Sequence, residues 1–354
     1  MADLSNKFCR KPFEHFEVHP NGNVSLCCYS WLPYHAGKIT PKHSVHDVFN
    51  SDIVKGIRES IHDGSFKFCN HELCPHIQNG DLPDKDSVEG PRMQRIVNEK
   101  LTDDLMPDFY NLCYDESCNL QCPSCRSNKI SHTTGPLYEM RKRVQDRMIK
   151  DLFYTEHTKN CTVNITGSGD PFGSKLFREL LFNIDCKKCP NLWINLQTNG
   201  VMFTEKVWNK MHKIHKNINT VIVSYDAGTE ETYNKIRVGG HWGQLQRNME
   251  FLSKLRSDKL INEFRIDYVV QENNFREMPL AIELGKKYNV DTVYFSLIVN
   301  WGTWTDQQFM NKAVYGQHHI DHCEFLELLE HPIFDDPIVD LGNVTQYRSR
   351  ACHG

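Results

Sequence analysis

Short apolar runs alternate with longer mixed segments along most of the chain. Runs rich in Val, Ile, Tyr and Phe predict six strands, at residues 109–114, 161–166, 192–198, 219–225, 264–271 and 292–299. The intervening segments predict helices near residues 136–153, 174–184, 204–214, 243–256 and 275–288. This alternation predicts an α/β fold whose parallel sheet is either open or closed into a barrel. Such sheets bind ligands at the carboxyl ends of their strands, so the loops after the strands form the candidate site.

The first 83 residues have a different pattern, with few apolar runs and many turn residues. The sequence HPNGN at 19–23 predicts a hairpin turn. A region this short of apolar core needs a further stabilising element, such as a bound metal. Residues 84–107 are charged and lack a strong apolar period, so we interpret them as the connection to the strand–helix domain at 108–305. Residues 306–354 then form a C-terminal extension.

The composition is that of an ordinary soluble protein. Of the 354 residues, 39% are apolar and 24% are charged. The 41 basic and 45 acidic side chains give a formal net charge of −4, which argues against a general nucleic-acid or anionic-membrane binder. No apolar run approaches the roughly 20 residues of a membrane span, and the amino terminus lacks the apolar core of a signal peptide. We therefore expect a cytoplasmic protein whose partners include neither nucleic acid nor a membrane.

The 14 cysteines change this picture, because in a long chain without a secretion signal they are metal ligands or catalytic groups more often than disulfides. One group lies in the first quarter of the chain: Cys9, Cys27, Cys28, Cys69 and Cys74. A second group follows the first predicted strand: Cys113, Cys118, Cys122 and Cys125. Two groups in two regions predict two metal sites.

Cys118, Cys122 and Cys125 follow the spacing C-x3-C-x2-C just after the first predicted strand. Iron–sulfur cubanes normally take four cysteines, so three would leave one iron open to another ligand. The alternative is a zinc site with a distant fourth ligand such as His132. Cys113 lies within the strand and is interpreted as a core residue.

This triplet resembles the signature of the radical S-adenosylmethionine (SAM) enzymes, and four further motifs extend the resemblance. The turn Thr166-Gly167-Ser168-Gly169-Asp170-Pro171 is similar to the family's Gly-Gly-Glu-Pro turn, which holds the amino group of SAM. The other motifs resemble the family's Thr-Asn-Gly, Ser-x-Asp and following arginine segments, and they supply Asn199, Ser224, Asp226 and Arg237. The resemblance implies a partial (β/α)6 TIM-like barrel, with SAM bound to the open iron of a [4Fe–4S] cluster.

One position departs from the family pattern. The residue before the third cysteine is usually bulky and packs near the adenine, but here it is Ser124. Contacts to the adenine must then come from elsewhere, such as the stretch from Asn300 to Trp304. The tryptophan pair in that stretch is equally consistent with a core or substrate wall.

The amino-terminal cysteines Cys9, Cys27, Cys69 and Cys74 resemble the ligand set of the Twitch and SPASM domains, which hold auxiliary iron–sulfur clusters in radical SAM enzymes. Cys28 is a possible substitute for Cys27. The domain more often follows the barrel, whereas here it precedes it. Four cysteines would saturate a second [4Fe–4S] cluster, and the alternative is a four-cysteine zinc site.

The resemblance implies reductive cleavage of SAM to a 5′-deoxyadenosyl radical, which abstracts hydrogen from a substrate C–H bond. A saturated auxiliary cluster favours a net oxidation, such as a dehydrogenation or a crosslink, because it can accept an electron. The alternative is an epimerase with a cysteine hydrogen donor, for which Cys323 is the candidate. A non-catalytic zinc scaffold is a third hypothesis. The expected partners are a sugar-like small molecule or a peptide, and a reductant such as flavodoxin or ferredoxin.

The remaining cysteines do not lie at the carboxyl ends of predicted strands, where the candidate site is expected. Cys186 and Cys189 have the C-x2-C spacing of metal or redox pairs but lie before the third strand, so no ligand role is assigned to them. The histidines His318, His319 and His322 are interpreted as a solvated helix face.

Overall fold

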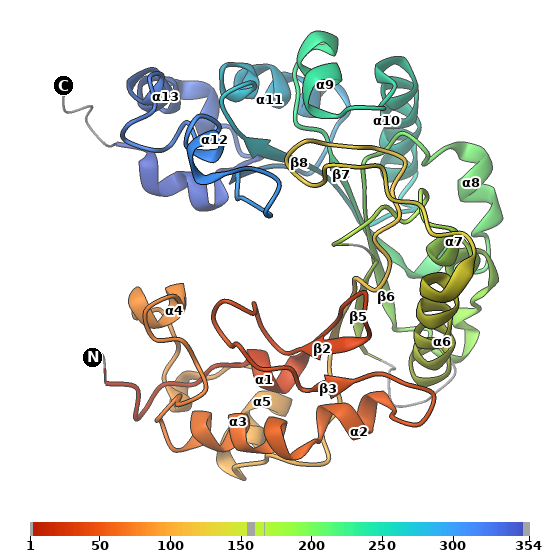
Figure 1. Ribbon diagram of the computed structural model, residues 1–354, viewed down its shortest axis with the longest axis vertical. Coiled ribbons are helices and arrows are strands. Elements are labelled where there is room, and N and C mark those ends of the chain that lie inside the picture. The colour runs from red at the N-terminus through yellow and green to blue at the C-terminus, as the bar shows by residue number, and fades with distance from the viewer. Residues whose placement is uncertain (1–2, 154–159, 166, 350–354) are drawn as a thin grey trace. The chain divides into compact units, whose positions relative to one another are not determined.

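The computed structural model describes residues 3–153, 160–165 and 167–349 (Figure 1). Thr166 of the predicted cofactor turn and the last five residues, with Cys352, lie outside this part. The chain forms two compact units. The first unit comprises Met1–Asp115, Thr133–Ser168 and Ile184–Trp193, and the second comprises Glu116–His132, Gly169–Asn183 and Ile194–Gly354.

The sheet of the first unit combines strands that lie far apart in the sequence. Its strands are β1 (His15–Val18), β2 (Asn23–Ser25), β3 (Gly37–Lys38), β4 (Phe109–Leu112) and β5 (Thr162–Ile165), arranged in the order β5-β4-β1-β2-β3. β1 pairs in parallel with β4, and β4 with β5, while β1, β2 and β3 are antiparallel. The turn at 19–23 joins β1 to β2, as the sequence predicts. The first strand of the Cys-rich region therefore belongs to the same sheet as β4.

The helices of the first unit are α1 (Lys11–Glu14), α2 (Val45–Phe49), α3 (Asp52–His62), α4 (Pro75–Gln78), α5 (Pro91–Asn98) and α6 (Gly135–Leu152). α2 begins with a capping box, in which Ser44 and Asp47 satisfy each other's backbone N–H groups. α5 lies inside the segment interpreted as a connection, and it buries Met93 and Ile96. Its single apolar stripe among charged residues explains why the pattern was too weak to predict a helix.

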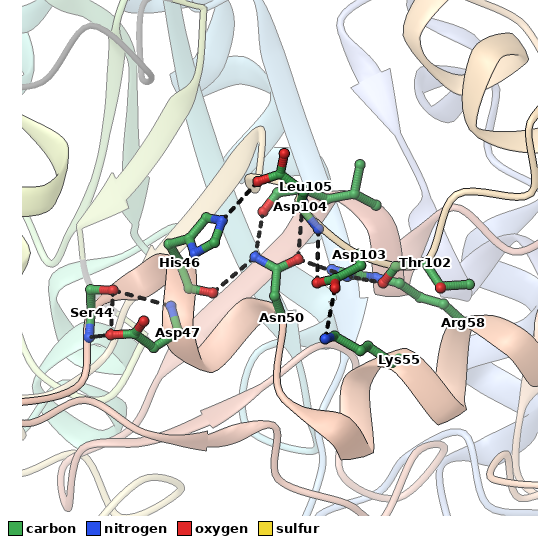
Figure 2. A network of polar contacts seen from close by, with 10 residues as sticks. All are labelled: Ser44, His46, Asp47, Asn50, Lys55, Arg58, Thr102, Asp103, Asp104 and Leu105. Atoms are coloured by element: carbon green, nitrogen blue, oxygen red, sulfur yellow. Dashed lines mark hydrogen bonds and ion pairs between the residues drawn. The ribbon is translucent and has the colours of Figure 1, made fainter.

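A polar network holds the segment before β4 against α2 and α3 (Figure 2). The side-chain amide of Asn50 donates to the carbonyls of His46 and Leu105, each at 2.9 Å, and accepts from the N–H of Leu105 at 2.9 Å. The fully buried Arg58 donates to the carbonyl of Thr102 at 2.8 Å, and its guanidinium lies 4.3 Å from the ring centre of Phe49. The side chains of Asn50 and Arg58 thus form hydrogen bonds with backbone groups of the irregular segment before β4.

The second unit contains the strand–helix alternation. Its strands are β6 (Trp193–Thr198, in this unit from Ile194), β7 (Ile218–Ser224), β8 (Glu263–Val270), β9 (Thr292–Leu297) and β10 (Val339–Asp340), in the order β10-β9-β8-β7-β6. All of their pairings are parallel. The helices are α7 (Lys175–Asn183), α8 (Glu205–Lys210), α9 (Glu230–Ile236), α10 (Trp242–Ser257), α11 (Met278–Lys287), α12 (Asp306–Met310) and α13 (His322–Leu329). α10 packs against β8, and α11 packs against β8 and β9 (Figure 1).

The predicted fold class is confirmed. All six predicted strands are present, as β4 to β9, with parallel pairing and intervening helices of the partial (β/α)6 type. α8 ends at Lys210, earlier than expected, and α9 was not anticipated. The domain boundaries drawn at residues 83, 107 and 305 stay a prediction. No helix within the described residues is long and apolar enough to cross a membrane.

Candidate functional site

The loop after β4 brings three cysteines into one tight turn of the second unit. Cys118 is anchored by a hydrogen bond from its N–H to the carbonyl of Ile130 at 2.9 Å. The carbonyl of Cys122 accepts from the N–H groups of Cys125 and Arg126, at 2.9 and 3.0 Å. These hydrogen bonds fix the backbone of the cysteine loop.

Nitrogen donors point at the sulfur of Cys118. The backbone N–H of Leu120 lies 3.4 Å from this sulfur, and the side-chain amide of Asn199 lies 3.7 Å from it. Burial raises the pKa of the Cys118 thiol to about 11, so the free thiol is protonated at neutral pH. Donors around it favour the thiolate form that a metal cluster requires.

An arginine side chain donates a hydrogen bond to each of the other two sulfurs. Arg126 donates to the sulfur of Cys125 at 3.3 Å and to the carbonyl of Glu116 at 2.6 Å. Arg237 donates to the sulfur of Cys122 at 3.8 Å. Burial raises the pKa of Cys122, and Arg237 opposes that increase. The donor set of this loop fits a cluster held by three thiolates.

Asp170 organises the turn after β5 rather than presenting a free carboxylate. Its Oδ1 accepts from the N–H groups of Phe172 and Gly173, at 2.9 and 2.8 Å. Its Oδ2 accepts from the Thr198 hydroxyl at 2.8 Å and from the Asn199 N–H at 2.9 Å. The carboxylate is buried and joins two strand ends of the second unit.

The glycines of this turn occupy positions that exclude a side chain. Gly167 has φ of 153°, and a Cβ there would lie 2.4 Å from the sulfur of Cys113. Ser168 donates to the Cys113 carbonyl at 2.6 Å. Gly167 and Ser168 belong to the first unit, and Gly169 begins the segment Gly169–Asn183 of the second unit. Cys113 itself is buried, as predicted for a core residue.

Asn199 lies directly at the cysteine loop. Besides its contact with Cys118, its side-chain amide donates to Asn119 Oδ1 at 2.9 Å. Asn119 also contacts the turn after β5, because a Cβ on Gly173 would lie 2.8 Å from the Asn119 backbone nitrogen. The loop after β6 and the cysteine loop are thus in contact, as the order of motifs predicts.

Asp226 and Arg237 form a buried ion pair at 2.6 Å. Asp226 has φ of 59°, a left-handed conformation that is sparsely populated outside glycine and asparagine-like residues. Its Oδ1 accepts from the N–H of Val269 at 2.8 Å. Burial raises the pKa of Asp226 even though Arg237 opposes the change. Ser224, the last residue of β7, lies half-buried opposite Asp267 of β8.

The four amino-terminal cysteines line one small cavity of the first unit, together with apolar side chains that include Pro12, Leu32 and Phe66. The cysteines are Cys9, Cys27, Cys69 and Cys74. Burial raises the pKa of Cys9 to about 12, and the other three thiols raise it further. Four thiols that converge on an apolar cavity fit a saturated iron–sulfur cluster.

Cys28 is exposed and does not line this cavity. Among the described residues, no three His, Cys, Asp or Glu side chains lie close enough to hold a single metal ion.

Cys323 lies in α13 and is disulfide-bonded. Its role as the hydrogen donor of an epimerase stays a prediction. Trp301 is 74% exposed, and Trp304 stacks against Phe309. Neither tryptophan belongs to a packed core.

Two contacts of the cysteine loop were not foreseen. Arg126 and Asn119 flank the cysteines in the sequence, and the only available signal was their position beside the triplet. Cys186 and Cys189 are buried in the first unit near Cys161, whose pKa they raise in addition to the effect of burial.

Comparison with protein families locates two domains in the chain. The model of the radical SAM superfamily matches residues 116–274. The model of an iron–sulfur cluster-binding domain, SPASM, matches residues 9–76. No curated protein sequence matches the chain.

Several solved structures are similar to part of this chain. SuiB of Streptococcus suis bound to its precursor peptide SuiA is 13% identical, with a TM-score of 0.41, over 70% of this chain and 53% of SuiB. Native anSMEcpe with bound AdoMet is 21% identical, with a TM-score of 0.45, over 64% of this chain and 59% of that chain. TYW1 with a lysine–pyruvate adduct is 15% identical, with a TM-score of 0.39, over 62% of this chain and 70% of TYW1. This chain thus spans little more than half the length of the first two.

Proposed function

Because this chain carries a radical SAM domain behind an iron–sulfur cluster-binding domain, we propose that it is an enzyme that cleaves SAM reductively and oxidises a substrate C–H bond. The radical SAM domain binds SAM and a [4Fe–4S] cluster, and the amino-terminal domain binds an auxiliary cluster. When bound, these groups would supply one-electron chemistry and a hydrogen-abstracting radical.

The residues of the chain have separate tasks in this proposal. Cys118, Cys122 and Cys125 hold the first cluster, and the donors at their sulfurs tune it. The turn containing Gly167, Ser168, Gly169 and Asp170 approaches the amino group of SAM with its backbone, because the Asp170 carboxylate is already engaged.

The end of β7 and the loop after β6 complete the cofactor site. Asn199, Ser224, Asp226 and Arg237 contact SAM or orient the groups that do. Arg237 has a double task, since it pairs with Asp226 and donates to Cys122.

The observation that carries the proposal is the set of N–H donors directed at the three sulfurs of one loop. A buried thiol in a merely structural role needs no cation beside it, whereas a cluster of thiolates is stabilised by such donors.

A net oxidation is preferred over an epimerisation for two reasons. Cys9, Cys27, Cys69 and Cys74 line a single apolar cavity, so a saturated auxiliary cluster is available as an electron acceptor. The candidate hydrogen donor Cys323 is disulfide-bonded. The substrate is a small polar molecule or a peptide.

Iron content tests this assignment. Anaerobically reconstituted protein should contain about eight irons per chain, since each of two cubanes holds four. The variant Cys118/Cys122/Cys125→Ala should retain about four irons and lose SAM cleavage. Cys28→Ala, which removes an exposed cysteine outside the cavity, is the control and should keep the full iron content. Wild-type protein without iron would contradict the proposal. Four irons in the wild type and none in the triple variant would mean that the amino-terminal site holds no iron–sulfur cluster and cannot accept an electron.

A further inference from the structure

The sheet of the second unit has one face covered by helices and one face that stays accessible. Side chains of β8 and β9 alternate between fully buried and partly exposed along both strands. Val293 of β9 lies opposite Ile266 of β8 on the buried face, and a Cβ on Gly285 of α11 would lie 2.4 Å from the Val293 side chain. Parallel sheets are usually buried on both faces. The accessible face is therefore a candidate surface for a ligand.

The accessible face is polar towards the carboxyl ends of its strands. Ser224 of β7 lies opposite Asp267 of β8, and Asp267 lies opposite Tyr294 of β9. Arg265 lies two residues before Asp267, so both side chains point to the same face. We call Arg265, Asp267 and Tyr294 the polar patch. Ser224 belongs to the candidate cofactor site, and adjacent strands lie about 4.8 Å apart, so the polar patch borders that site.

The side chains of the polar patch hold one another in place. Arg265 donates to Asp267 through two hydrogen bonds, from Nε to Oδ1 at 2.6 Å and from Nη2 to Oδ2 at 3.0 Å. The Arg265 guanidinium also lies 4.8 Å from the ring centre of Tyr294. The cation and the carboxylate match each other in charge. The polar patch is thus an ordered surface whose ion pair carries no net charge.

The polar patch still has hydrogen-bonding atoms that a ligand can reach. Within the described residues, the Tyr294 and Ser224 hydroxyls and Arg265 Nη1 have no hydrogen-bond partner, and none of these three atoms is buried. Each oxygen of Asp267 accepts one N–H from Arg265, whereas a carboxylate offers about four acceptor positions. Donors and acceptors are therefore available side by side.

We propose that the polar patch binds a polyhydroxylated small molecule as the substrate, an assignment that rests on the proposed function. A hydroxyl group both donates and accepts, so neighbouring hydroxyls can donate to the oxygens of Asp267 while they accept from Arg265 or Tyr294. An ammonium group has no acceptor and would be repelled by Arg265. A phosphate group would be repelled by Asp267.

The accessible face offers little to the apolar side chains of a peptide. Among the partly exposed residues of β7, β8 and β9, only Ile222 and Val269 are aliphatic. Peptide recognition uses pockets that take particular side chains. The composition of this face thus favours a polyol over a peptide.

Binding to the reconstituted full-length protein with SAM tests the ligand class without turnover. Isothermal titration calorimetry compares myo-inositol, D-glucose and D-ribose with their fully O-methylated forms and with N-acetyl-glycyl-phenylalanyl-glycine amide. At least one polyol should bind about tenfold more tightly than its methylated form, because methylation removes every O–H donor. Equal binding of all free and methylated forms would overturn the proposal. Tighter binding of the peptide than of every polyol would overturn it as well.

Two variants and one control locate the binding. Tyr294→Phe keeps the ring beside Arg265 and removes only the hydroxyl, so it should weaken polyol binding several-fold. Asp267→Asn should weaken it further, and Tyr294→Phe keeps the test valid if that variant does not fold. The control is Tyr288→Phe, which removes a hydroxyl that donates to Gln246 of α10, and it should bind like the wild type.

Unchanged polyol binding in Tyr294→Phe and in folded Asp267→Asn would overturn the proposal. SAM cleavage, followed as 5′-deoxyadenosine on the same samples, reports on the proposed function separately. Wild-type protein that binds the polyol but does not cleave SAM would contradict the proposed function and leave the ligand class of the polar patch standing.

Discussion

Single side chains in this protein take on tasks that their motif does not reveal. Asp170 occupies the place of a cofactor-binding acid in the family pattern, yet both of its oxygens accept hydrogen bonds from the protein. Asp226 stands in a left-handed conformation because Arg237 and the N–H of Val269 hold its carboxylate. The buried carboxylates of the candidate site are thus each paired with specific donors. Removing a donor leaves its carboxylate buried and unpaired, which destabilises the folded protein.

Asp170→Asn should lower the free energy of unfolding by about 3 kcal/mol, because a charged acceptor of four hydrogen bonds becomes a neutral amide. Urea denaturation of the unreconstituted protein measures the change. Glu250→Gln, an exposed carboxylate of α10 in the same unit, should have almost no effect. Equal stability of the two variants would show that Asp170 does not hold the strand ends together.

Arg237→Met should destabilise the protein by about 3–5 kcal/mol, since it leaves Asp226 buried and unpaired. Burial raises the pKa of Asp226, and without Arg237 nothing opposes that increase. A carboxyl group whose pKa is raised in the folded state stabilises that state at low pH, where it is protonated, and this contribution is lost as the pH rises. The difference in unfolding free energy between Arg237→Met and the wild type should therefore grow between pH 5 and pH 8. Arg237→Lys keeps the charge and should lose much less.

The potential of the first cluster gives a second measurement on Arg237→Met. Removing a positive charge and a donor from Cys122 should make the cluster harder to reduce, so its potential should become more negative. An unchanged potential would contradict the contact between Arg237 and the cluster ligand.

Elements that depend on local pattern could be predicted, and those that depend on distant partners could not. The strands β4 to β9 are apolar runs of strand length, so periodicity was sufficient. α5 and α9 are short and contain few apolar residues, and tertiary contacts rather than propensity stabilise them. The pairing of β1 with β4 has no local signal, because parallel neighbours need not be near in sequence.

The same distinction applies to the candidate site. The spacing of Cys118, Cys122 and Cys125 was enough to identify them as a group. Two of the donors at their sulfurs, Arg237 at the end of α9 and Asn199 in the loop after β6, lie far from the cysteines in the sequence and could be placed only by the family resemblance.

Asn50→Ala tests how an element is anchored. The variant removes two hydrogen bonds to Leu105 and one to the carbonyl of His46 in α2 (Figure 2), and it should cost about 2 kcal/mol of unfolding free energy. Limited proteolysis should then cut residues 99–107 faster. Asn98→Ala changes an exposed residue of α5 and serves as the control. Unchanged cleavage in Asn50→Ala would mean that other contacts anchor the segment.

Across the whole chain, the amino-terminal region is joined to the rest by a shared sheet. β1 lies between β2 and β4, so it covers an edge of β4 that would otherwise be open. An open strand edge promotes pairing with other chains. The Cys-rich region is therefore a structural part of the fold and not a removable appendage.

Deleting residues 1–107 should yield aggregated protein, because the deletion exposes β4 along its length. Size-exclusion chromatography with light scattering measures the outcome. Co-expression of residues 1–107 as a separate chain should restore soluble material by supplying β1. A soluble monomeric truncation would show that the pairing of β1 with β4 is dispensable.

The pairing of β1 with β4 also sets an order of events during synthesis on the ribosome. His15 leaves the exit tunnel about 90 residues before its partner Phe109, which amounts to roughly 5–20 seconds of translation. All four cysteines of the amino-terminal cavity have emerged by the end of that interval, ahead of β4. The nascent chain thus presents a complete set of thiols to the iron–sulfur assembly machinery before β4 is available to pair with β1. We therefore expect that iron supplied during translation increases the yield of folded protein more than iron supplied after release.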